Sequence, residues 1–162
     1  MTDLIQQRYE GDKQRKDCFL CSAAMAAGVD YDTAWSRLED DLRQALGPSG
    51  RGPQGDQCDR ILKHLGFDRV MVPARRGPPT DEPGDFWVLF MLPEYATHGF
   101  LRNILWGRRA LIQVPSKNYA GEHHIVYWDG RALFDPSNER MWAWPEIHPI
   151  YIWLFDEAKP AA

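Results

Sequence analysis

The sequence predicts an α+β fold, with helices in the first part of the chain and a mostly antiparallel sheet in the second. Helical patterns bounded by Gly and Pro occupy residues 18–65, and short runs rich in β-branched and aromatic residues follow from residue 69 onward. A chain of 162 residues, 44% of them hydrophobic, is long enough to bury one core. We therefore expect a single domain over residues 1–162.

The first helix is expected at residues 18–27, a segment that contains four Ala together with Leu and Met. Asp17 precedes it as a candidate N-cap, and Gly28 follows it as a candidate C-cap. Cys18 is consequently expected at the N-terminus of a helix.

Two further helices are expected at residues 32–46 and 56–65. The breaker-rich run 47–53 separates them, and Gly66 ends the later one. One apolar stripe supports the helix at 32–46: Ala34, Leu38, Leu42 and Leu46.

The sheet is expected to form from seven short segments: 69–72, 86–92, 110–114, 123–128, 132–135, 140–144 and 150–155. A short helix at 97–106, ending at Gly107, interrupts them. The Pro-rich run 73–84 is expected to be a surface loop rather than a domain linker.

A hairpin is the sharpest local signal, because Asp129-Gly130 separates two apolar runs. A two-residue turn at these positions predicts three cross-strand pairs: Trp128 with Arg131, Val126 with Leu133, and His124 with Asp135. A histidine and a carboxylate then lie opposite each other, about 5 Å apart at Cβ. His123 is expected to point to the other face of the sheet.

A histidine oriented by a carboxylate is two thirds of a nucleophilic triad, and Cys18 is the best candidate for the missing nucleophile. The N-terminus of a helix favours a thiolate and supplies N–H groups that can bind an oxyanion. The chain order is Cys18, then His124, then Asp135.

These residues resemble the papain-like cysteine peptidases. The likeness is greatest to the small bacteriocin-processing peptidases and to their stand-alone relatives in bacteria and phages. It covers residues 7–36 and 111–137, and it rests on four motifs: Asp17-Cys18 opening an Ala-rich helix, Gly28-Val29-Asp30-Tyr31, the strand from His124 to Gly130, and Asp135-Pro136-Ser137. The resemblance implies a papain-like α+β fold, with N-terminal helices packed on the C-terminal sheet.

The resemblance also implies a role for each site residue. Cys18 is expected to be the nucleophile, His124 the general base and later acid, and Asp135 the residue that orients the histidine. The implied activity is that of a cysteine peptidase or related amide hydrolase that works through a thioester. A deamidase or a transglutaminase-type acyl transferase would use the same triad.

The oxyanion glutamine of this family has two candidates here, Gln7 and Gln14. Relatives place it six residues before the cysteine, where this chain has Asp12. Gln14 is nearer to that position, but Gln7 precedes Arg8 at the end of an expected first strand and is slightly favoured. A second departure is Phe19, which stands where many relatives have Gly and is expected to narrow the cleft.

Two other classes of protein are considered beside the enzyme. An inactive papain-like peptide-binding domain would tolerate the displaced glutamine. A zinc or dithiol protein would use Cys18 and Cys21, but no second pair follows, and Cys58 and His64 are poorly spaced for a metal. We expect Cys21 and Cys58 to pack in the interior, with no metal and no cofactor.

Charge and hydropathy limit the expected partners. The formal net charge is −4 and the pI is near 5.7, so nucleic acid and anionic membranes are not expected partners, and the expected partner is a protein or peptide substrate. The longest apolar run, residues 86–92, is far shorter than a membrane span, and the polar start of the chain is unlike a signal peptide. The protein is therefore expected in the cytoplasm.

Overall fold

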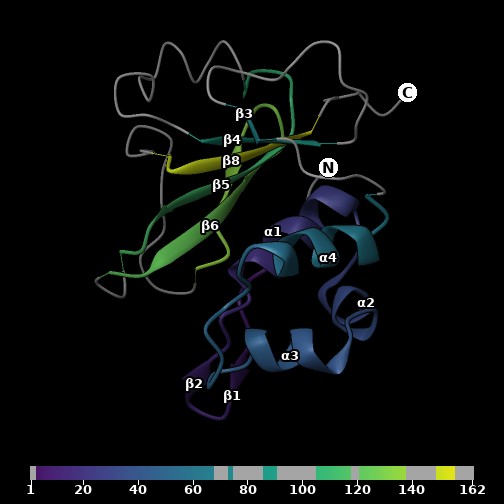
Figure 1. Ribbon diagram of the computed structural model, residues 1–162, viewed down its shortest axis with the longest axis vertical. Coiled ribbons are helices and arrows are strands. Elements are labelled where there is room, and N and C mark those ends of the chain that lie inside the picture. The colour runs from purple at the N-terminus through teal and green to yellow at the C-terminus, as the bar shows by residue number, and fades with distance from the viewer. Residues whose placement is uncertain are drawn as a thin grey trace.

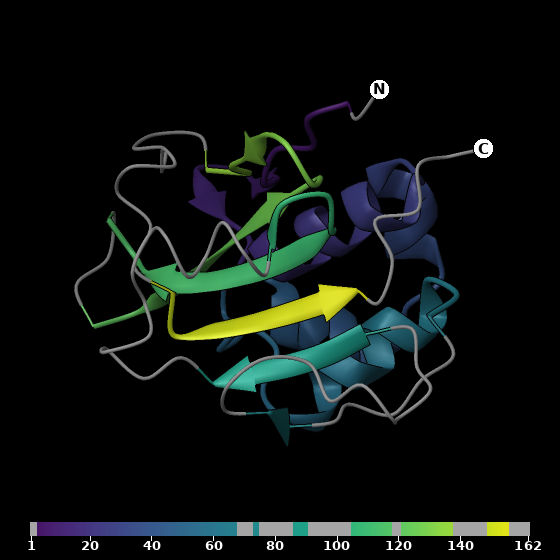
Figure 2. The same cartoon turned by 90° about the horizontal axis from the view of Figure 1, so that it is seen from above.

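The computed structural model describes residues 3–67, 73–74, 86–90, 105–117, 121–137 and 149–155. These residues form an α+β structure in which a six-stranded sheet is covered on one side by helices. Figure 1 shows α1 and α4 next to the sheet, with α2 and α3 farther from it. Figure 2 shows the twisted sheet from above, lying over the helices. None of the described helices is long and apolar enough to cross a membrane.

The helices are α1 Cys18–Ala27, α2 Tyr31–Ser36, α3 Asp40–Leu46 and α4 Asp56–His64. The predicted bounds of α1 are confirmed, as is its C-cap, because Gly28 adopts a left-handed conformation with φ 70°. The predicted third helix is confirmed as α4 to within one residue of its end.

The prediction of one helix over residues 32–46 was wrong, because the structure has two helices with a break at residues 37–39. Glu39 is extended, with φ −73° and ψ 159°, which ends the helical path. The Arg43 side chain, from α3, donates to the carbonyl oxygens of Trp35 and Ser36. It thereby provides hydrogen-bond donors for two carbonyl groups at the C-terminal end of α2. The predicted stripe is nevertheless buried throughout: Ala34, Leu38, Leu42 and Leu46.

The strands are β1 Tyr9–Glu10, β2 Lys13–Gln14, β3 Pro73–Ala74, β4 Phe86–Phe90, β5 Ala110–Pro115, β6 His123–Trp128, β7 Leu133–Phe134 and β8 Tyr151–Phe155. β1 and β2 form a separate antiparallel hairpin. The main sheet has the order β3-β4-β8-β5-β6-β7, and only the β3–β4 pair is parallel. The prediction of a mostly antiparallel sheet is confirmed for the described strands.

Several predicted segments differ from the structure or lie outside it. The run 73–84 begins as strand β3 rather than as a loop. The rest of that run, the predicted strands at 69–72 and 140–144, and most of the predicted helix at 97–106 lie outside the described residues.

The core forms where α1 meets the sheet. Eight residues of α1 are buried. They are buried around the whole helix because the sheet lies on one side of α1 and the other helices lie on the other. The sheet contributes these buried residues to the core: Leu111, Ile125, Tyr127, Trp153 and Phe155. The first turn of α1 is fixed to the sheet by Phe19, whose ring meets the Trp153 ring edge-on at 5.2 Å between centroids.

Candidate active site

Cys18 is the first residue of α1 and is only partly buried, whereas the two residues after it are almost completely buried. The first hydrogen bond of the helical ladder runs from the N–H of Cys21 to the carbonyl of Asp17 at 2.9 Å. The N–H groups of the first turn therefore precede the ladder and lie beside the thiol. This position gives Cys18 both access to solvent and the positive end of a helix.

The predicted capping role of the Asp17 side chain was wrong. The Asp17 carboxylate makes no capping hydrogen bond to α1. It instead accepts a hydrogen bond from the Tyr31 hydroxyl at 2.6 Å and one from the Arg8 N–H at 3.2 Å. Burial raises the pKa of this carboxyl above its ordinary value, although these hydrogen bonds act in the opposite direction.

His124 and Asp135 meet as a buried pair. His124 Nε2 lies 2.6 Å from Asp135 Oδ1, and the two side chains are 10% and 1% exposed. Asp135 Oδ1 also accepts a hydrogen bond from the Ser137 N–H at 2.8 Å. These contacts fix the carboxylate, and the carboxylate in turn fixes the imidazole ring.

The predicted hairpin register was wrong by two residues. In the structure Trp128 pairs with Leu133, and the N–H of Asp129 donates to the carbonyl of Ala132 at 3.1 Å, so Gly130 and Arg131 form the turn. The Asp129 carboxylate accepts from the N–H groups of Arg131 and Ala132, which stabilises this later turn.

The displaced turn keeps His124 and Asp135 together. A shift of two residues preserves the alternation of side chains, so both residues stay on the same face of the ribbon, diagonal rather than opposite. β7 ends at Phe134, which leaves Asp135 free of the ladder. His123, as predicted, points elsewhere: it is exposed, and its Nδ1 lies 2.6 Å from Gln113 Nε2.

The thiol of Cys18 reaches the same imidazole. Burial lowers the pKa of His124, but the hydrogen bond to Asp135 and the electrostatic interactions with Cys18 and Asp135 outweigh it and raise the pKa to about 10. The three predicted residues therefore converge, although they come from α1, β6 and the segment after β7.

The two candidate glutamines differ in what their side-chain amides contact. Gln7 Nε2 donates to the Arg15 carbonyl at 3.1 Å, and the Gln7 main-chain N–H donates to the Pro136 carbonyl at 2.9 Å. Gln14 lies in β2, and its Nε2 is buried with no hydrogen-bond partner among the described residues. An amide donor buried without an acceptor is costly and calls for an explanation.

Cys21 and Cys58 are packed in the core, as predicted. Burial, with the nearby Asp17 and Cys18, raises the pKa of Cys21 well above its ordinary value. Burial and Asp59 raise the pKa of Cys58 to about 12. A buried, protonated Cys21 is a poor partner for Cys18 in a metal or dithiol site. Within the part of the chain that the structure describes, no cluster of His, Cys, Asp or Glu is arranged to hold a metal ion.

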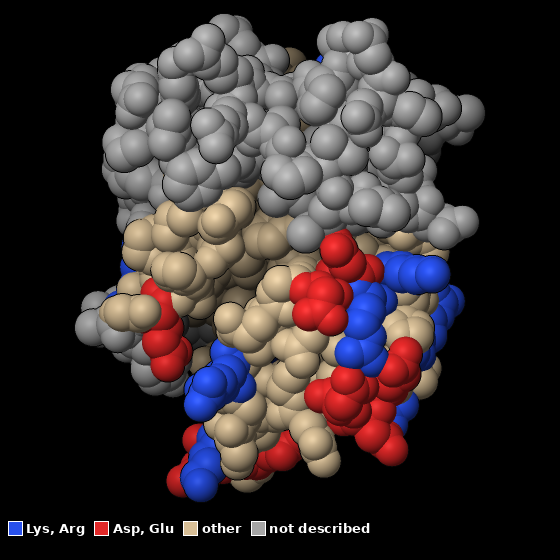
Figure 3. All heavy atoms as spheres, viewed as in Figure 1, with Lys and Arg blue, Asp and Glu red and all other residues tan. Residues whose placement is uncertain are grey.

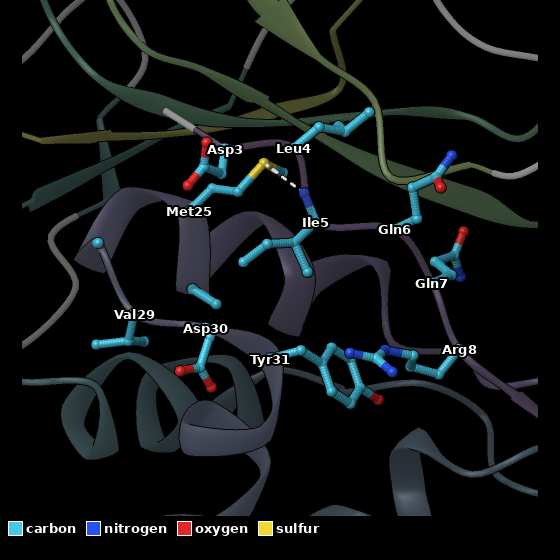
Figure 4. A pocket seen from close by; sticks show the side chains of 12 residues that line it. Asp3, Leu4, Ile5, Gln6, Gln7, Arg8, Met25, Val29, Asp30 and Tyr31 are labelled. Carbon is cyan, nitrogen blue, oxygen red and sulfur yellow. Dashed lines mark hydrogen bonds between the residues drawn. The ribbon is translucent and has the colours of Figure 1, made fainter. Parts of the chain in front are cut away.

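A pocket of about 610 Å³ lies apart from the triad, along the extended N-terminal segment. Figure 4 shows this segment crossing α1, with Ile5 joined to Met25 by a hydrogen bond from its N–H to Sδ and with Arg8 beside Tyr31. The lining includes the carboxylates of Asp3 and Asp30.

Acidic and basic side chains are mixed on the helical part of the surface seen in Figure 3. On this part of the protein Arg60 of α4 forms ion pairs with Asp41 and with Glu39, and Glu39 also contacts His64 at 3.0 Å. These exposed contacts join α3 to α4 and contribute little to stability individually.

Sequence reasoning missed the contacts that surround Asp17. The Arg15 guanidinium donates to the Tyr31 hydroxyl at 2.9 Å and lies over the Trp35 ring, 3.9 Å from its centroid. Tyr31 was part of a matched motif, but nothing in the spacing of these residues connects them to Asp17.

Comparisons with protein-family models, with curated proteins and with solved structures give no match to this chain.

Proposed function

We propose that this chain is a cysteine peptidase or closely related amide hydrolase with a papain-like fold, in which Cys18, His124 and Asp135 form the catalytic triad. The observation that carries the proposal is the buried hydrogen bond between the His124 imidazole and the Asp135 carboxylate, on a histidine whose pKa is also raised by the nearby Cys18 side chain. The partial exposure of Cys18, next to a nearly buried His124 and a buried Asp135, supports the assignment of the thiol as the group that meets substrate.

The proposed reaction starts from the pair in which the proton of the Cys18 thiol resides on His124 as an imidazolium, and the thiolate attacks an amide carbonyl carbon. The tetrahedral oxyanion collapses as the C–N bond breaks, and the His124 imidazolium gives its proton to the leaving amine. Water then adds to the thioester with His124 again as base, which releases a carboxylic acid and restores the thiol. Asp135 holds the imidazole and balances its positive charge throughout.

Gln14 is our preferred donor for the oxyanion, together with the N–H groups at the start of α1. Its Nε2 has no acceptor among the described residues, whereas Gln7 already donates to Arg15. A buried donor without a partner among the described residues suits a group whose acceptor develops only during the reaction.

Alkylation of Cys18 tests the triad without a known substrate. Iodoacetamide should label Cys18 at mildly acidic pH, while Cys21 and Cys58, which are buried and have raised pKa values, stay unlabelled. His124→Ala should slow this labelling sharply, because it removes the imidazolium that stabilises the thiolate. His123→Ala is the matched control and should leave the rate unchanged. Labelling that starts only above about pH 8, as for an ordinary thiol, or that ignores His124, refutes the proposal.

The substrate class is tested by treating a cell lysate with wild type and with Cys18→Ala and comparing the products by mass spectrometry. New peptide ends present only with the wild type support a peptidase, and a gain of about 1 Da at Gln or Asn side chains supports a deamidase. The absence of any difference, with both proteins folded, supports a peptide-binding domain instead.

A further inference from the structure

The N-terminal segment, residues 3–8, forms a strap that touches both sides of the candidate site. Two consecutive residues of the strap make the contacts: the Gln7 N–H donates to the Pro136 carbonyl at 2.9 Å, and the Arg8 N–H donates to Asp17 Oδ2 at 3.2 Å. Pro136 directly follows Asp135, and Asp17 directly precedes Cys18. The strap thus joins the segment that bears the orienting carboxylate to the helix that bears the thiol.

The strap is held by a closed set of contacts around the buried Asp17 carboxylate. The Tyr31 hydroxyl donates to Asp17 Oδ2 at 2.6 Å and accepts from Arg15 at 2.9 Å. The Arg15 carbonyl accepts from Gln7 Nε2 at 3.1 Å, which returns the chain of contacts to the strap. The Arg8 guanidinium lies over the Tyr31 ring, 4.6 Å from its centroid (Figure 4).

The Asp17 side chain gains nothing for α1 itself, because it makes no capping hydrogen bond. It is 0% exposed, and burial of a carboxylate is unfavourable unless hydrogen bonds or opposite charges compensate for the lost hydration. The contacts that it does make fix the backbone immediately before Cys18. Small displacements of this backbone move the sulfur relative to His124, and catalytic geometry is sensitive to such displacements.

We propose that Asp17 is a positioning residue, which uses Tyr31 and the N-terminal strap to hold Cys18 against the His124–Asp135 pair. The inference rests on the proposed function for its catalytic meaning, but the geometry that it asserts is testable without any substrate. Asp17 acts through Cys18 and touches no reacting atom.

The test follows the titration of His124 by NMR, because the contact with Cys18 is one of the causes that raise its pKa. Cys18→Ala gives the downward shift that complete loss of this contact produces. Asp17→Leu removes the acceptor, and we expect a downward shift of at least half of that reference value. Asp17→Asn also removes the charge but keeps an oxygen that accepts from Tyr31 and Arg8, so it should titrate close to wild type.

Tyr31→Phe keeps the charge of Asp17 and removes one donor, and it provides a second test if Asp17→Leu does not fold. It should shift the His124 titration in the same direction, while Tyr9→Phe, at an exposed tyrosine of β1, should not. Protection of Cys21 and Cys58 from alkylation shows in each variant that the core is intact.

Two outcomes overturn the inference: folded Asp17→Leu and Tyr31→Phe variants that titrate like wild type, or an Asp17→Asn variant that shifts as far as Asp17→Leu. The second result would show that the charge of Asp17, and not the position that it holds, affects His124. Failure of the proposed function looks different, because the titration would still respond to Asp17 while the lysate treated with wild type yielded no product.

Discussion

Replacing Asp135 removes the acceptor of two buried donors at once. The Asp135 Oδ1 atom binds His124 Nε2 at 2.6 Å and the Ser137 N–H at 2.8 Å. His124 is 8% exposed and Ser137 is 1% exposed, so water cannot readily replace the lost acceptor. Truncation of one partner of a buried charged pair costs about 3–5 kcal/mol of unfolding free energy, and we expect this loss for Asp135→Ala. Asp135→Asn keeps an oxygen acceptor and should cost less, about 1–2 kcal/mol, because hydrogen bonds to a charged group are stronger than those between neutral groups.

The pH dependence of this loss follows from the direction of the His124 pKa shift. The folded-state pKa is raised to about 10 from an ordinary value of 6.5, although burial alone would lower it. A group with a raised pKa stabilises the fold fully below its unfolded value, and the stabilisation disappears as the pH rises through the folded value. The difference in stability between wild type and Asp135→Asn should therefore be largest near pH 6 and should shrink as the pH approaches 10.

Urea unfolding of both proteins, measured from pH 6 to pH 10, checks this dependence, and NMR titration of His124 gives its cause directly. In Asp135→Asn the His124 pKa should fall toward its ordinary value. A stability difference that stays constant across this range, or an Asp135→Ala variant as stable as wild type, would refute the assignment of a charged, buried His124–Asp135 pair.

Three further outcomes are expected. Gln14→Ala should lower kcat by about a hundredfold or more with an unchanged circular dichroism spectrum, whereas Gln7→Ala should mainly lower the melting temperature; equal effects on kcat would reject Gln14 as the oxyanion donor. Gly130→Ala should destabilise the hairpin in thermal melts, because Gly130 has φ 102° and a Cβ there would lie 3.3 Å from the Gly107 carbonyl carbon; an unchanged melting temperature would contradict the assigned turn. Leu42→Ala, at a side chain that is 0% exposed, should cost about 2–5 kcal/mol in urea unfolding, and a loss below about 1 kcal/mol would show that Leu42 is not a core residue.

Elements whose conformation depends on residues nearby in the sequence could be predicted well. α1 begins and ends where the sequence placed it, because Gly28 supplies a left-handed stop and the segment before it is rich in strong helix formers. β5 and β6 were also predicted to within one residue, since their β-branched and aromatic runs suit a strand that is buried on both faces. The alternation of side chains was enough to bring His124 and Asp135 to one face, even with the turn misplaced.

The predictions that failed depended on groups distant in the sequence. The helix over residues 32–46 breaks where Arg43 reaches back to the carbonyls of Trp35 and Ser36, and no periodicity carries that signal. The local pattern predicts that the Asp17 carboxylate caps α1. In the structure the carboxylate accepts hydrogen bonds from the Tyr31 hydroxyl and the Arg8 N–H instead.

The sequence by itself determined the α+β class, the position of Cys18 at a helix N-terminus and the pairing of His124 with Asp135. Each of these follows from capping residues, hydrophobic periodicity or the two-residue alternation of a strand, which act over a few residues. Only the tertiary structure decided that the Cys18 side chain lies within electrostatic reach of this pair, and that, among the described residues, the Gln14 amide lacks a hydrogen-bond partner while the Gln7 amide has one. Such contacts join segments far apart in the chain, and they form because packing α1 on the sheet buries apolar surface. The hydrophobic effect is non-directional, so the sequence carries no pattern that links the particular residues brought together.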